Sequence, residues 1–148
     1  MSQVDSQKLA DFADACRRAL EGLATNQGSM FHRFPLGACG PASELVGRLL
    51  GEHLGLSGRY VCGSGHPDLG PTQSHAWVES DELIIDITHD QFSNTGVSGW
   101  VLPIESAWHR RFGNIKRRSG FCMPSGWPMY PHDGYRAMLQ AVEARDSA

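Results

Sequence analysis

FPLGACGPAS (residues 34–43), SHAWVE (residues 74–79) and LIIDIT (residues 83–88) are the stretches that decide the fold. The first runs into an apolar helical pattern over residues 40–54, in which Pro41 suits the first turn. The other two are short, apolar or β-branched, and predict paired strands joined by a turn at Ser80-Asp81. A cysteine at a helix start is thereby placed in the same fold as a strand histidine and an aspartate.

The predicted hairpin brings His75 and Asp86 together. If the turn centres between Ser80 and Asp81, the two residues lie equally far from it and are directly opposed. Opposed side chains in an antiparallel pair have Cβ atoms about 4.5–5.5 Å apart, within reach of a hydrogen bond. The pairing depends on the register, because a slip of one residue would put the two side chains on opposite faces.

Cys39, His75 and Asp86 together have the residue types of a nucleophile, a general base and an orienting acid. The unpaired N–H groups and the positive dipole end of a helix N-terminus favour a thiolate at Cys39. The same N–H groups can donate to a developing oxyanion. Taken alone, Cys39 is equally compatible with a buried structural cysteine, and it is the conjunction with His75 and Asp86 that favours chemistry.

Length and composition indicate one globular domain spanning residues 1–148. The chain is 41% hydrophobic and 20% charged, with a formal net charge of −3, which argues against a nucleic-acid-binding role. One basic segment stands out, from His109-Arg110-Arg111 to Lys116-Arg117-Arg118. A solvated surface is the favoured interpretation of that segment, and a site for an anionic partner is the alternative.

Neither a membrane span nor a secretory signal is expected. No run approaches the roughly 18 apolar residues of a spanning helix, and the N-terminal residues lack the basic and apolar regions of a signal peptide. Four cysteines without a zinc-type spacing predict free thiols in a reducing, cytoplasmic compartment. Apart from Cys39, they are interpreted as structural or bystander thiols: Cys16, Cys62 and Cys122.

Periodicity and turn residues predict the remaining elements. Residues 113–132 are expected to be mostly irregular, and residues 64–73 form a Gly- and Pro-rich loop that is more plausible as a connection than as a lid. The expected helices span residues 4–23, 106–112 and from the cap Asp133 to about Arg145, and the expected strands span residues 59–63 and, at an edge or bulge, 100–104.

Several polar residues near these segments are secondary candidates. His32 and Arg33, upstream of Cys39, could supply a side-chain oxyanion donor, and Gln91 could contact substrate or the oxyanion. His89 and Asp90 could serve as an alternative base and acid, although they follow the end of the predicted strand.

These motifs resemble the transglutaminase-like branch of the papain-like cysteine enzymes. The resemblance covers roughly residues 34–92 and is carried by PLGAC entering a helix, SHAWVE on a strand and IDIT on the next. It is similar to the pattern of bacterial transglutaminase-like proteins, including lasso-peptide leader peptidases, and toxin deamidase domains share the Cys–His–Asp order. The resemblance implies an α+β fold, with the nucleophile-bearing helix packed on an antiparallel sheet, and a Cys39–His75–Asp86 triad.

The expected function is therefore a cysteine-dependent amide hydrolase, a peptidase or deamidase, that acts on a peptide or protein without a metal or organic cofactor. Acyl transfer to an amine by the same triad is the first alternative. A catalytically silent binding module, using the aromatic loop around Trp127 and Tyr130, is the second. A metal site is the third; it would use His75, Asp86, His89 and Asp90, whose spacing is not that of a familiar site.

Overall fold

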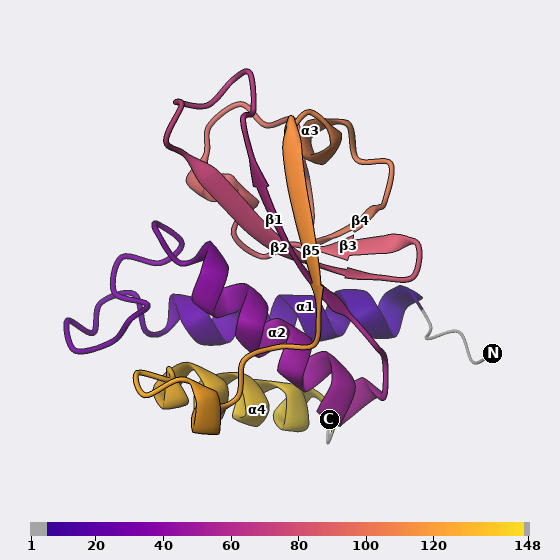
Figure 1. The fold of residues 1–148 in the computed structure, drawn as a ribbon. Coiled ribbons are helices and arrows are strands. Elements are labelled where there is room, and N and C mark those ends of the chain that lie inside the picture. Colours follow the sequence, from indigo (N-terminus) through magenta and orange to yellow (C-terminus); the bar gives the residue numbers. More distant parts are fainter. Residues whose placement is uncertain (1–5, 147–148) are drawn as a thin grey trace.

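The computed structural model describes residues 6–146, and within them the chain forms four α-helices, five β-strands and two short 3₁₀ turns (Figure 1). The expected α+β class, with helices packed on an antiparallel sheet, is confirmed. In chain order the elements are α1 (Ser6–Glu21), α2 (Cys39–Leu54), β1 (Arg59–Ser64), β2 (Ser74–Ser80), β3 (Leu83–Ile85), η1 (His89–Gln91), β4 (Val101–Pro103), α3 (Ala107–Arg110), β5 (Asn114–Ser119), η2 (Pro124–Gly126) and α4 (His132–Asp146).

One antiparallel sheet with strand order β4-β3-β2-β1-β5 organises the molecule. Helices α1 and α2 cover one face, where α2 packs on the central strands β2 and β1, and α4 packs on these helices on the side away from the sheet (Figure 1). The short helix α3 lies over the other face, where Trp108 packs against Val61 of β1 and Trp77 of β2. The sheet therefore has two differently covered sides.

Helix α2 follows the predicted apolar stripe, with Leu45, Val46, Leu49 and Leu50 all buried. Its first residue is Cys39, as the sequence indicated. It ends at Leu54, and the cap residue Gly55 adopts the left-handed conformation, with φ of 68° and its N–H donating to the Gly51 carbonyl. Glycine adopts that conformation without steric cost, which explains the position of the helix end.

Helices α1 and α4 pack against each other, and α4 also contacts α2. The predicted helix over residues 4–23 is observed as Ser6–Glu21, and residues 4 and 5 lie outside the described part of the chain. Asp133 was expected to cap α4, but the helix already begins at His132, and Asp133 accepts the Gly134 N–H from within the first turn. Among residues 6–146, no helix combines the length and apolar character needed to cross a bilayer.

The β2–β3 hairpin has a different register from the predicted one. The paired residues are Val78 with Ile85 and Ser80 with Leu83, so the two loop residues are 81 and 82. Asp81 turns the chain with a positive φ of 52°, which aspartate tolerates better than most residues. The shift equals two positions, so every side chain stays on its predicted face, but His75 and Asp86 are not directly opposed.

Strand β5 is a correction to the sequence analysis, which treated residues 113–132 as mostly irregular. Asn114–Ser119 pairs along the whole length of β1. Its side chains are exposed apart from the partly buried Ile115, so the strand carries no apolar alternation that a pattern search could detect. The other strands and the short helix α3 lie where the sequence placed them.

The two faces of the sheet have different cores. The helical face is filled mainly by aliphatic residues of α1, α2 and α4, packed on Val78 and Ile85. The opposite face is rich in aromatic rings, and its buried members are Val61, Trp77, Ile84, Leu102, Trp108 and Phe112. Three buried histidines belong to the same aromatic surroundings: His66, His75 and His109.

Candidate functional site

Cys39 is the first residue of α2 and is partly exposed. The preceding residue, Ala38, provides no side-chain cap, so the helix start keeps N–H groups that are free to bind an anion. The helix packs on β2, and this contact brings its N-terminus to the start of the strand that carries His75. The three predicted site residues are thus brought together by α2, β2 and the residue that follows β3.

His75 and Asp86 form a buried hydrogen-bonded pair. His75 Nε2 lies 2.7 Å from Asp86 Oδ2, and the two residues are 0% and 2% exposed. Although they are diagonal rather than opposed in the hairpin, diagonal neighbours on one face remain within reach of long side chains. The predicted contact therefore survives the change of register.

The environment of Cys39 favours its thiolate. Burial raises the pKa of the Cys39 thiol, but the hydrogen bond and charge of His75, the Ala76 N–H and the Gln91 side chain outweigh burial, so the pKa lies below its ordinary value. Because Asp86 occupies Nε2 of His75, the ring nitrogen that faces the thiol is Nδ1.

His75 and Asp86 shift each other's pKa values in opposite directions. Burial lowers the pKa of His75, but the charge and hydrogen bond of Asp86, with help from Cys39, raise it to about 9. Burial raises the pKa of the Asp86 carboxyl, but the charges and N–H donors of His75 and His109 hold it well below its usual range. The pair is therefore an imidazolium beside a carboxylate at neutral pH.

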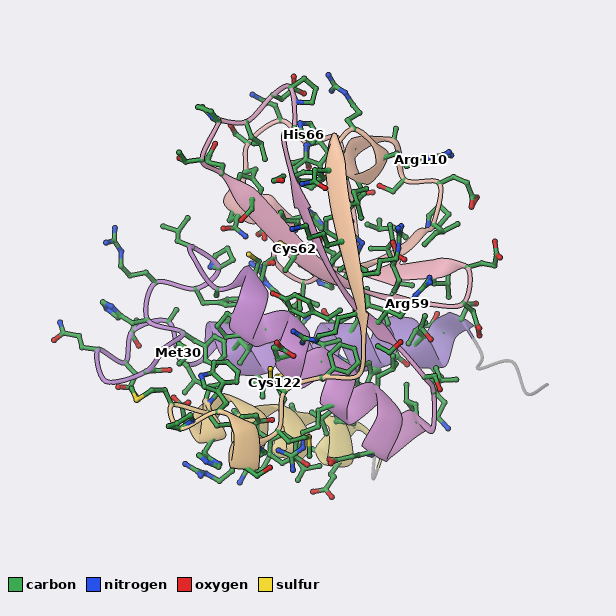
Figure 2. All side chains as sticks on the ribbon, in the orientation of Figure 1. Met30, Arg59, Cys62, His66, Arg110 and Cys122 are labelled. Carbon is green, nitrogen blue, oxygen red and sulfur yellow. The ribbon has the colours of Figure 1, made fainter. Side chains whose placement is uncertain are left out.

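The other three cysteines differ from Cys39. All four are free thiols. Burial raises the pKa of Cys16, which is a core residue as predicted, and burial is also the main cause that raises the pKa of Cys62 and Cys122. Figure 2 shows Cys62 on β1 and Cys122 in the segment that follows β5. Cys39 is thus the one cysteine whose surroundings favour the thiolate.

His109 is a site residue that the sequence analysis placed only in a basic surface segment. It lies on α3, is 1% exposed, and its Nε2 is 2.7 Å from Asp86 Oδ2, the oxygen that also bonds His75. Its other ring nitrogen lies 2.7 Å from Ser106 Oγ. The signal available in the sequence was the neighbouring Trp108, an apolar residue that indicates a buried turn.

Aromatic rings enclose the His75 imidazole. Ring centroids of Trp77, Phe92, Trp108 and Phe112 lie 5.3–6.4 Å from it. Such surroundings exclude water and strengthen the charge interaction with Asp86. Because His75 and Asp86 are buried and Cys39 is partly exposed, Cys39 is the residue of the three that a dissolved reagent can reach.

Among the predicted oxyanion contacts, only Gln91 lies at the site. Its Nε2 is 3.4 Å from His75 Nδ1 and 3.2 Å from the Thr88 carbonyl, and the Gly37 N–H lies 3.4 Å from its Oε1. Within residues 6–146, the side chains of His32 and Arg33 make no hydrogen bond or ion pair.

The alternative pair His89 and Asp90 is directed elsewhere. His89 Nε2 lies 2.7 Å from the Gly99 carbonyl. Asp90 forms a two-oxygen ion pair with Arg17 of α1, at 2.7 and 2.9 Å. Neither residue approaches the Asp86 carboxylate, so the metal site considered from the sequence is not assembled.

A different group of possible metal ligands exists: His75, Asp86 and His109. Both N–O distances in this group are 2.7 Å. Ligand atoms that share a tetrahedral zinc at about 2.0–2.2 Å would lie roughly 3.4 Å apart. The observed spacing is that of N–H groups donating to an oxygen, so the cluster fits shared protons rather than a metal.

The loop of residues 64–73 is tied to the rest of the molecule. His66 Nε2 lies 2.9 Å from the Trp108 carbonyl, and the residue sits beside α3 (Figure 2). Asp68 forms an ion pair with Arg111 at 2.7 Å. These contacts agree with the interpretation of the loop as a connection.

The basic segment is partly neutralised within the fold. Arg111 bonds Asp68, Arg117 bonds the buried Glu79, and Arg118 bonds Glu44. These pairs reduce the positive charge that the segment offers to an anionic partner.

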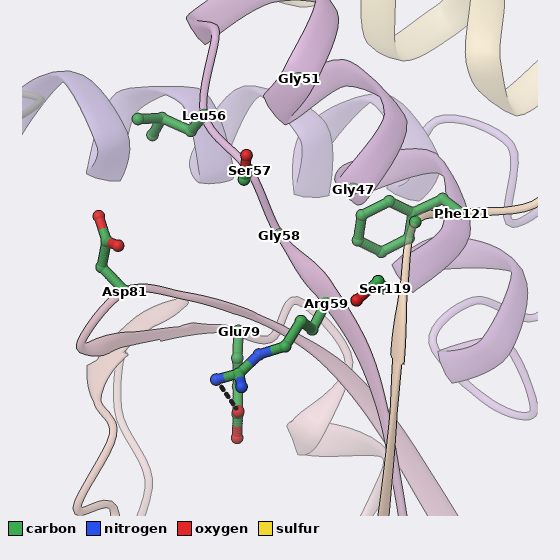
Figure 3. A pocket seen from close by; sticks show the side chains of 11 residues that line it. Gly47, Gly51, Leu56, Ser57, Gly58, Arg59, Glu79, Asp81, Ser119 and Phe121 are labelled. Atoms are coloured by element: carbon green, nitrogen blue, oxygen red, sulfur yellow. Dashed lines mark hydrogen bonds and ion pairs between the residues drawn. The ribbon is translucent and has the colours of Figure 1, made fainter.

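An open groove of about 660 Å³ lies away from these residues, between α2 and the strands (Figure 3). Figure 3 shows Phe121 against Gly47, where an added Cβ would come within 2.1 Å of the ring. None of the three predicted site residues lines this groove, whose lining residues are Gly47, Gly51, Leu56, Ser57, Gly58, Arg59, Glu79, Asp81, Ser119, Gly120 and Phe121.

Comparisons with known proteins give little guidance. No protein-family model matches the chain, and no curated protein matches it. A crystal structure of a genomics target aligns with 95% of this chain and 79% of its own, at 17% identity and a TM-score of 0.49. A likeness of that strength carries no argument about fold or function.

Proposed function

We propose that this protein is a cysteine-dependent amide hydrolase, a peptidase or deamidase, with a papain-like, transglutaminase-like core. Cys39 is the nucleophile, His75 the general base and Asp86 the residue that orients His75. The observation that carries the proposal is the buried His75–Asp86 bond of 2.7 Å, whose second imidazole nitrogen faces the Cys39 thiol at the start of α2. A structural cysteine would not need that arrangement.

The reaction starts from a thiolate–imidazolium pair. The Cys39 thiolate attacks the amide carbonyl carbon, and the carbonyl electrons move to the oxygen. N–H groups at the start of α2, together with the Gln91 side-chain amide, are placed to donate to that oxyanion. His75 then gives its proton to the amine, which leaves as the carbon–nitrogen bond breaks, and a thioester with Cys39 remains.

Hydrolysis completes the cycle. His75, now neutral, takes a proton from water, and the resulting hydroxide attacks the thioester carbonyl. The carbon–sulfur bond breaks, the acid product leaves, and Cys39 and His75 return to the ion pair. Asp86 remains a carboxylate throughout and stabilises the imidazolium. An amine in place of water gives acyl transfer by the same steps, which keeps that alternative open.

The test is the rate of Cys39 alkylation by iodoacetamide as a function of pH, with mass spectrometry resolving the four cysteines. We expect Cys39 to be alkylated at pH values well below the ordinary thiol pKa of about 8.5. The three other thiols should react appreciably only as the pH approaches that value. At pH 6 the variant His75→Gln should react roughly 10- to 100-fold more slowly, because its thiolate fraction falls.

The opposite result would favour the silent binding module. In that case Cys39 would react no faster than Cys122 and would be indifferent to the His75 change. The exposed apolar side chains near the aromatic loop, including Met129 at 73% exposure, would then be the first surface to test for a partner.

A further inference from the structure

Asp86 accepts hydrogen bonds from several directions. His75 of β2 and His109 of α3 both lie 2.7 Å from Oδ2, and the Thr88 N–H lies 3.0 Å from Oδ1. One oxygen of this buried carboxylate is thus shared between two imidazole rings, while the other accepts from the N–H and the hydroxyl of Thr88.

The orientation of His109 is fixed on both sides. Its ring packs edge-on against Trp77, with centroids 4.8 Å apart, and against Trp108 at 5.0 Å. Because Asp86 is a carboxylate, the nitrogen of His109 that faces it must carry the proton. In the neutral ring the other nitrogen is then an acceptor, and Ser106 Oγ–H donates to it.

We propose that His109 is a positioning residue that acts on His75 through Asp86, by taking a share of the charge on the oxygen that His75 also uses. The inference rests on the proposed cysteine chemistry and adds a residue to it. The groups that face this oxygen are the two imidazoles, and the groups that face His75 from its other side are Cys39 and Gln91.

The physical consequence concerns the proton on His75. Two N–H donors on one oxygen compete for the same negative charge, so each bond is weaker than it would be alone. Without His109, Asp86 would hold the His75 proton more tightly. With it, the imidazolium stays acidic enough to pass that proton to a leaving amine, which general acid catalysis requires.

The test is a pH titration of the seven histidines by ¹⁵N NMR, with the His75 resonance assigned through His75→Gln. The variant His109→Phe keeps a packed ring but donates no hydrogen bond. We expect the pKa of His75 to rise by about one pH unit, the scale on which a charged or hydrogen-bonded neighbour shifts a side chain. An unchanged or lowered pKa of His75 would overturn the inference.

A matched control separates charge sharing from structural damage. His66 is another buried histidine that packs on Trp108, but it bonds the Trp108 carbonyl rather than Asp86. His66→Phe should lower stability and leave the His75 titration unchanged. Equal shifts in both variants would identify a general packing effect and refute the proposal.

A second variant covers the case in which His109→Phe fails to fold. Ser106→Ala removes the hydroxyl that bonds the other ring nitrogen of His109, at a partly buried position, and should raise the pKa of His75 by a smaller amount. No rise would count against the inference. The pH profile of Cys39 alkylation in the unmodified protein tests the proposed function independently of His109. Activated Cys39 together with an unmoved His75 in His109→Phe would reject the inference alone.

Discussion

The two faces of the sheet use opposite kinds of stabilisation. The face under α2 is closed by aliphatic side chains such as Leu45 and Leu49, which are fully buried and carry no polar atoms. The face under α3 buries the Asp86 and Glu79 carboxylates among aromatic rings, and each carboxylate is satisfied by several donors. The first face needs volume, and the second needs partners for its polar atoms.

The two faces should respond differently to substitution and to pH. An aliphatic core tolerates substitutions of similar volume and is indifferent to pH. A buried ionic network is costly to desolvate, so the stability of this face depends on its charges and hydrogen bonds as well as on packing. Cys39 lies where the two faces meet, because its helix belongs to the first face and its partner His75 to the second.

The largest expected effect is that of Asp86→Asn. Removing the charge takes the buried carboxylate partner away from the His75 imidazolium, which should reduce the free energy of unfolding by about 3–5 kcal/mol and slow Cys39 alkylation at pH 6. Urea unfolding and mass-spectrometric labelling measure the two effects. Glu79→Gln is the matched control on the same face, and it should lower stability without changing the labelling. If both variants slowed Cys39 labelling equally, Asp86 would have no specific role in activating Cys39.

The aliphatic face should show a loss of stability alone. Leu49→Ala removes a fully buried side chain and should reduce the free energy of unfolding by about 2–5 kcal/mol through lost burial and a cavity. The pH profile of Cys39 alkylation, measured in the absence of urea, should be the same as in the unmodified protein. A displaced profile would mean that the two faces are coupled through α2.

Cys39→Ala should make the free energy of unfolding fall more steeply with rising pH than it does in the unmodified protein. In the unmodified protein the raised pKa of His75 makes stability fall as the pH rises, whereas the lowered pKa of Cys39 makes it rise, so the two effects oppose each other. In Cys39→Ala only the His75 effect remains. The stability that His75 provides is then complete below its unfolded pKa of about 6.5 and is lost as the pH rises through its folded pKa, which lies below about 9 because the hydrogen bond and charge of Cys39 are gone. The slope is at most about 1.4 kcal/mol per pH unit. Urea unfolding at a series of pH values measures the slope, and parallel curves for the two proteins would contradict it.

The smallest effect should come from an exposed ion pair over the second face. Arg111 and Asp68 are about half exposed, and pairs of this kind contribute about 0–1 kcal/mol. Arg111→Ala should therefore change the free energy of unfolding by less than about 1 kcal/mol, and high salt should remove the difference. A larger loss would show that the loop of residues 64–73 supports the buried histidines.

The contact between His75 and Asp86 could be predicted although the hairpin register could not. Alternation along a strand determines which face a residue occupies, and a shift by two positions preserves it. The turn was centred on Ser80-Asp81, whereas the structure places residues 81 and 82 in the loop, because Asp81 adopts a positive φ that no local pattern specifies.

His109 could not be assigned to the site for a different reason. It lies 23 positions from Asp86 along the chain, on a helix of four residues, and its neighbours Arg110 and Arg111 suggest a surface. Only the way α3 folds back over the second face brings it to the carboxylate. Strand β5 was missed because its polar side chains follow no apolar alternation, although its backbone pairs fully with β1.

The two outer strands of the sheet, β4 and β5, have a consequence for how copies of the molecule meet. An unpaired strand is a template for aggregation. Strand β4 is only three residues long and ends in Pro103, which has no N–H to offer. Strand β5 carries three long charged side chains, Lys116, Arg117 and Arg118, and charged residues on an edge strand oppose pairing with a second copy. We therefore expect concentrated solutions of the folded protein to remain free of fibrils.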